Sequence, residues 1–121
     1  MIKEILLVGA GSFLGGVARY LIALAMKGIH TVLPWATLTA NIAGCFLIGV
    51  FWALFCRGFS NSSMHLFLAV GFCGGFTTFS TFSRESVLLL QSGNYTASIL
   101  YVVGSAVFGI FAVMAGFVLA K

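Results

Sequence analysis

The chain has 121 residues, of which 61% are apolar and 7% are charged. Soluble domains usually carry about a quarter of their residues as Asp, Glu, Lys or Arg, so an ordinary water-soluble enzyme is excluded. Six basic and two acidic residues give a net charge of +4, but they are scattered along the chain, which excludes a nucleic-acid-binding patch. Since a membrane-spanning helix needs about 20 residues, the length fits four spans with short connections. The sequence therefore predicts a single all-α membrane domain over residues 1–121.

The first apolar segment covers about residues 5–26 and carries one internal charge, Arg19. Arg19 lies toward the far end of a hydrocarbon core that is about 30 Å thick. Two interpretations are open: the guanidinium extends to the membrane interface, or it lines a water-filled vestibule and attracts anions. Gly11, Gly15 and Gly16 on the same segment predict close approach of a neighbouring helix.

The second segment covers about residues 35–55 and has Asn41 among apolar neighbours. An amide without a hydrogen-bond partner is costly inside a membrane. Asn41 therefore either hydrogen-bonds a neighbouring helix or points its two N–H donors at a permeating ion.

The third segment, about residues 64–91, does not predict one continuous helix. Glycines and hydroxyl residues replace aliphatic ones in residues 71–83 (GFCGGFTTFSTFS), and each glycine weakens a helix by roughly 1 kcal/mol relative to alanine. We expect a break near the middle of the membrane, where protein or a polar cavity must satisfy the freed backbone groups. The break indicates either an ion site built from exposed carbonyls or a small-residue face for tight packing, and both remain open.

Two phenylalanines follow the expected break. Phe79 and Phe82 are three positions apart and share a helix face, with Ser80 and Thr81 between them. Core packing explains such a pair, but the electropositive ring edges are also suited to lining a path for a small anion.

The end of this polar stretch, Arg84 and Glu85, is expected to be a solvated helix end. Neither Glu4 nor Glu85 is then a carboxylate at bilayer depth. The pattern therefore disfavours a proton-coupled exporter of the small multidrug type, which remains the alternative function.

The fourth segment covers about residues 96–120, after a turn at residues 91–94. Tyr101 and Ser105 are four positions apart and predict a polar track on one face of this helix.

The distribution of charge gives little preference for one orientation. Lys3, Arg57 and Lys121 would lie on one side of the membrane, and Lys27 and Arg84 on the other. This asymmetry is weak for the positive-inside rule. The charges therefore leave insertion in both orientations open, and such insertion would make an antiparallel homodimer possible, with its axis in the membrane plane.

Three stretches resemble the CrcB/Fluc family of fluoride channels: residues 15–20 (GGVARY), 37–44 (TLTANIAG) and 71–85 (GFCGGFTTFSTFSRE). The third is long and unusual in composition, and the turn at residues 91–95 (QSGNY) is also similar. The resemblance implies an antiparallel, dual-topology homodimer with two fluoride pores in the plasma (inner) membrane of a bacterium. The implied function is passive fluoride export from the cytoplasm, with fluoride, the lipid bilayer and a second copy of the chain as partners.

Within the pore, the resemblance implies that Asn41 donates to fluoride and that Phe79 and Phe82 form an aromatic box. Ser80 and Thr81 would offer hydroxyl groups.

The resemblance places Arg19 at the anion-attracting vestibule and adds Tyr101 and Ser105 to the pore. It also implies a central, non-permeating sodium ion held by backbone carbonyls of Gly74 and Thr77 from both subunits. The chain departs from the family at Gly109, one turn past Ser105, where members often have a further hydroxyl.

Overall fold

The computed structural model describes residues 1–59 and 61–121, and Ser60 lies outside the described residues. Over these two ranges the chain is helical and contains no strand, which confirms the predicted all-α class. In chain order the elements are α1 (Ile2–Ala25), α2 (Trp35–Leu54), η1 (Phe55–Phe59), α3 (Ser62–Met64), η2 (His65–Cys73), α4 (Gly74–Phe76), α5 (Phe79–Gln91) and α6 (Tyr95–Ala120). The element η2 has the wider winding of a π-helix, whereas η1 contains a kink at Gly58, whose φ/ψ is 92°/7°.

Four helical stretches are long and apolar enough to cross a membrane: Ile2–Ala25, Trp35–Gly58, Ser62–Gln91 and Tyr95–Ala120. They are the four long apolar helices that the composition predicts. Large apolar side chains such as Phe13, Phe108 and Leu119 are mostly exposed on the outer faces. A helix that is apolar on all sides is suited to lipid surroundings rather than to water.

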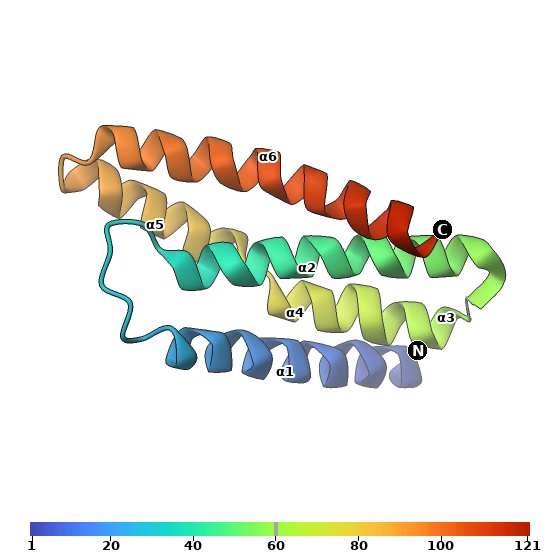
Figure 1. Cartoon of the computed structure of the whole chain (residues 1–121). Helices are drawn as coiled ribbons and strands as arrows, with labels where there is room; N and C mark the ends of the chain where they lie inside the picture. Colours follow the sequence, from blue (N-terminus) through green and yellow to red (C-terminus); the bar gives the residue numbers. More distant parts are fainter. Residues whose placement is uncertain (60) are drawn as a thin grey trace.

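The long helices run along one another in two closely packed groups. α1 lies beside η2 and α4, while α2 lies beside α6 (Figure 1). Glycine permits the contacts of the first group, because a Cβ atom on Gly75 would lie 2.5 Å from the carbonyl oxygen of Ser12. Gly11 and Gly15 of α1 face the backbone of the same neighbour, which confirms the predicted close approach. The prediction is wrong for Gly16, which faces open space.

The predicted break in the third segment is confirmed. α4 ends at Phe76, and Thr77 and Thr78 have extended backbone, with φ/ψ of −95°/156° and −147°/120°. Thr78 starts α5, because its side-chain oxygen accepts a hydrogen bond of 3.2 Å from the backbone N–H of Thr81. The π-helical winding of η2 immediately before the break is of a kind often found at functional sites.

Two glycines have positive φ: Gly93 (83°) in the turn predicted at residues 91–94, and Gly58 (92°) after α2. Both termini lie at the end of the molecule where α2 turns toward α3 (Figure 1). There the Arg57 guanidinium donates a hydrogen bond of 3.0 Å to the carbonyl of Ala120. An even number of long helices returns the chain to the side on which it began.

Candidate functional site

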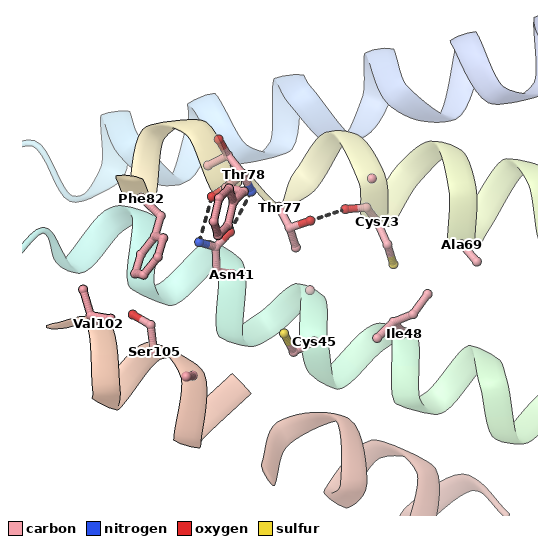
Figure 2. A pocket seen from close by; sticks show the side chains of 14 residues that line it. Asn41, Cys45, Ile48, Ala69, Cys73, Thr77, Thr78, Phe82, Val102 and Ser105 are labelled. Atoms are coloured by element: carbon pink, nitrogen blue, oxygen red, sulfur yellow. Dashed lines mark hydrogen bonds between the residues drawn. The ribbon is translucent and has the colours of Figure 1, made fainter. Parts of the chain in front are cut away.

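A cavity of about 600 Å³ lies beside the helix break, between α2, the broken third segment and α6 (Figure 2). Six of the residues that the sequence singles out line it: Asn41, Gly74, Thr77, Phe79, Phe82 and Ser105. Four others lie outside its lining: Arg19, Ser80, Thr81 and Tyr101. The structure thus gathers residues from three segments of the chain around one space.

Asn41 fastens α2 to the break. Its side-chain N–H donates to the Thr78 carbonyl at 3.1 Å, and its side-chain oxygen accepts from the Thr78 N–H at 2.8 Å (Figure 2). These bonds satisfy both backbone groups of a residue that has no helical partner on either side. Asn41 was expected either to hydrogen-bond a neighbouring segment or to donate to an ion, and the structure shows the first. One of the two amide N–H groups remains for another acceptor.

The carbonyl groups around the break fall into two classes. The Cys73 carbonyl accepts both the N–H and the hydroxyl of Thr77, at 3.0 and 2.8 Å. The Gly75 carbonyl accepts from Arg19, at 3.2 Å. The carbonyls of Gly74 and Thr77, by contrast, accept from no donor among residues 1–59 and 61–121. Both residues line the cavity.

Ser105 on α6 brings a hydroxyl group to the same space. Its oxygen is buried, and within the described parts of the chain it is the side-chain polar atom that is buried without a hydrogen-bond partner. Leaving a buried polar group unsatisfied costs about 1–3 kcal/mol. In Figure 2 the Ser105 hydroxyl lies on the same side of the cavity as Phe82. The Ser105 hydroxyl is therefore a buried donor without an acceptor, on a residue that lines the cavity together with Asn41.

Aromatic rings form a row along this face. The ring centroids of Phe79 and Phe82 are 5.8 Å apart, and those of Phe82 and Tyr101 are 5.2 Å apart. The rings are tilted by 44° and 49°, so that edges as well as faces are presented to their surroundings. Phe79 is 79% exposed in the single chain, which is unusual for a residue placed at the centre of a site.

The predicted solvated helix end at Glu85 is wrong. Glu85 lies within α5 and is half-buried. Its two carboxylate oxygens accept hydrogen bonds from the hydroxyls of Thr37, at 3.1 Å, and Tyr101, at 3.0 Å. The Tyr101 hydroxyl hydrogen is therefore committed to a carboxylate. Arg84, the neighbouring residue, is exposed.

Two hydroxyl residues of the predicted pore lie at the start of α5 rather than in the cavity wall. The Thr81 backbone N–H is bound by Thr78, and the Ser80 hydroxyl lies 3.4 Å from the Thr78 hydroxyl. Their part in a pore remains a prediction.

Eight lining residues were not singled out as site residues, and three of these carry a thiol or a hydroxyl group: Cys45, Cys73 and Thr78. Thr78 lies inside the glycine- and hydroxyl-rich stretch, and the preference of threonine for the first position before a helix could have indicated its capping role. The Sγ atom of Cys45 would lie 3.4 Å from a Cβ atom on Gly109. At the place where the family often has a further hydroxyl, this chain therefore brings a thiol of α2 against the backbone of α6.

Comparison with known proteins identifies the family. Residues 6–117 match the family described as "CrcB-like protein, Camphor Resistance (CrcB)". The chain is 48% identical over 115 residues to the fluoride-specific ion channel FluC of Phocaeicola vulgatus, covering 94% of this chain and 95% of that protein. It is 48% identical over 119 residues to FluC of Chlorobium chlorochromatii, covering 98% and 92%, and 44% identical over 122 residues to FluC of Chlorobaculum tepidum, covering 100% and 97%. The chain belongs to the CrcB family.

Proposed function

We propose that this protein is a fluoride-selective channel, not an enzyme, and that it gives passive fluoride export from the cytoplasm. The observation that carries the proposal is the set of unused donors at the cavity: the buried Ser105 hydroxyl and the second N–H of Asn41. Relatives nearly half identical over almost the whole chain are named fluoride-specific ion channels. A bacterial plasma (inner) membrane is the location that fits this function.

The chemistry of the cavity suits a small, strongly hydrated anion. Such an ion enters a narrow space only where donors replace the water that it loses. Asn41 and Ser105 supply polar donors, and the ring edges of Phe79 and Phe82 add weakly positive C–H groups. Asp and Glu are absent from the described lining, so the passing anion meets no like charge there.

An antiparallel homodimer inserted in both orientations is part of the proposal. Phe79 and Gly74 line the cavity and yet are exposed in the single chain, so the pathway has an open side. A second copy that covers this side would complete the wall and bury the Phe79 ring. The weak charge asymmetry between the two ends agrees with dual topology.

A sodium ion at the break is the other part of the proposal. The Gly74 and Thr77 carbonyls are hard oxygen ligands without a donor among the described residues, and this donor set fits a hard cation. Two copies of the chain would supply four such oxygens. When bound, the ion would supply a fixed positive charge that favours an anion in the protein interior. The chain's own role is to hold these carbonyls away from helical hydrogen bonds, through Thr77, Thr78 and Asn41.

Fluoride release from liposomes tests the proposed function. Purified protein is reconstituted into vesicles loaded with potassium fluoride, and external fluoride is followed with an electrode. We expect release only after a potassium ionophore balances the charge, and no comparable release from vesicles loaded with chloride. Release that needs no ionophore and follows a proton gradient would instead support the proton-coupled exporter. Vesicles that hold their fluoride under all of these conditions would contradict the channel.

The aromatic rings give a prediction for the pathway itself. Replacing Phe79 or Phe82 with isoleucine removes a ring edge but keeps an apolar side chain. If the rings contribute about 1.4 kcal/mol to the passing ion, flux falls about tenfold or more in each variant. The measurement is the initial rate of fluoride release, with Phe13→Ile on the outer face of α1 as the control. Wild-type rates in both cavity variants would remove the rings from the pathway.

A further inference from the structure

Two side chains of α1 donate hydrogen bonds to carbonyls of the third segment. The Ser12 hydroxyl donates to Gly71 at 3.3 Å, and Arg19 Nε donates to Gly75 at 3.2 Å. Positions 12 and 19 are about two helical turns apart and therefore lie on one face of α1. The accepting carbonyls are about one turn apart. α1 is thus fastened along the half-helix that ends at the break.

The Gly75 carbonyl needs an outside donor because of where the helix ends. α4 stops at Phe76, so the carbonyls of its last turn have no N–H group four residues ahead in helical position. Four residues ahead of Gly75 is Phe79, the first residue of α5, and four ahead of Gly74 is Thr78, whose N–H is bound by Asn41 instead. Arg19 is half-buried and satisfies the Gly75 carbonyl with a charged donor, which is favourable at the carboxyl end of a helix.

We propose that Arg19 is a positioning residue of the break. By binding the Gly75 carbonyl it fixes the end of the half-helix, so that the neighbouring Gly74 carbonyl stays open to the cavity. The inference rests on the proposed function, but it differs from anion attraction by a vestibule charge. It assigns the effect of Arg19 to one N–H group at one place, and not to a long-range field.

The chemistry of three substitutions separates the two roles. Glutamine carries its side-chain nitrogen at the same distance along the side chain as Arg Nε, so Arg19→Gln keeps the donor and removes the charge. Arg19→Lys keeps the charge but has a methylene group where Nε was. Arg19→Met has a similar length and loses both. If Arg19 acts by positioning, the variant that keeps the donor, Arg19→Gln, should behave most like the wild type. If Arg19 acts through its electric field, the variant that keeps the charge, Arg19→Lys, should do so.

Amide hydrogen exchange measures positioning without relying on conduction. In purified, reconstituted protein, loss of a hydrogen bond from a charged donor is expected to speed exchange at Thr77 and Thr78 about tenfold or more in Arg19→Met and Arg19→Lys. Arg19→Gln should stay within about threefold of the wild type. Arg84→Gln, which removes an exposed cation from α5, is the matched control and should change nothing.

Fluoride release at two ionic strengths gives the second measurement. The range of a surface charge falls from about 30 Å at 0.01 M salt to about 3 Å at 1 M salt, so a field effect fades with salt whereas a positioning effect persists. We expect Arg19→Met and Arg19→Lys to be slowed about tenfold at both salt levels, and Arg19→Gln to stay within about threefold of the wild type.

Three results would overturn the proposal. The first is near-normal exchange and flux in Arg19→Lys, with a deficit in Arg19→Gln that disappears at high salt. The second is unchanged exchange at the break in all three variants. The third is failure of Arg19→Gln to fold. If the wild type releases no fluoride, the proposed function fails, and the exchange measurement still decides the role of Arg19.

Discussion

Replacing Asn41 with leucine is expected to abolish fluoride flux and to lower the free energy of unfolding more than any other single change in the cavity. The amide forms two hydrogen bonds with the backbone of Thr78, at 3.1 and 2.8 Å. Leucine has a similar volume and leaves both backbone groups without a partner. At about 1–3 kcal/mol for each unsatisfied group, the expected loss is about 2–6 kcal/mol. Unfolding by denaturant in detergent micelles measures this loss, and the liposome assay measures flux.

Asn41→Asp separates the contributions of the two hydrogen bonds between residue 41 and Thr78. Aspartate can still accept from the Thr78 N–H, but it cannot donate to the Thr78 carbonyl and it adds a negative charge facing the anion path. We expect a smaller loss of stability than in the leucine variant, of about 1–3 kcal/mol, together with an equally complete loss of flux. Gln91→Leu, at an exposed position at the end of α5, is the control and should change stability by less than about 0.5 kcal/mol. Wild-type stability in Asn41→Leu would show that the paired bonds do not hold the break.

The main features of the fold follow from local properties of the sequence. Apolar runs of about 20 residues predict four helices whatever their neighbours are. The break was also predictable, because glycine and threonine weaken a helix where they stand, and Thr78 can cap the helix that follows. Asn41 was predictable for a similar reason, because an amide is unusual within an apolar segment, whereas Phe79 and Phe82 were predicted from their spacing of three positions.

The residues whose surroundings the sequence did not predict have hydrogen-bond partners far away in the chain. Glu85 was expected to face solvent, but Thr37 reaches it from 48 positions away and Tyr101 from 16. Arg19 meets Gly75 across 56 positions. No periodicity within one segment shows which donor will lie opposite a given carboxylate or carbonyl. These contacts depend on the relative rotation of two packed helices, which is a property of the assembled fold.

The adjacent glycines Gly15 and Gly16 also differ only through the rotation of α1, because one faces the neighbouring backbone and the other does not. Gly15→Ala would place a methyl group over the Phe72 carbonyl oxygen and 2.8 Å from the Phe76 backbone nitrogen. Both atoms belong to the backbone of the half-helix before the break, which cannot move without shifting the break itself. We expect a loss of about 1–3 kcal/mol in the free energy of unfolding and a strong loss of flux.

Gly16→Ala is the matched control for this change, because a Cβ atom there meets nothing within 4 Å. Alanine is also the better helix former, so Gly16→Ala should stabilise the protein by about 0.5–1 kcal/mol and leave fluoride flux unchanged. Unfolding midpoints of the two variants, measured side by side in the same detergent, check both signs. Equal stability of the two variants would contradict the close backbone contact between α1 and the half-helix. The opposite signs expected for neighbouring residues follow from the rotation of α1, which turns Gly15 toward the break and Gly16 away from it.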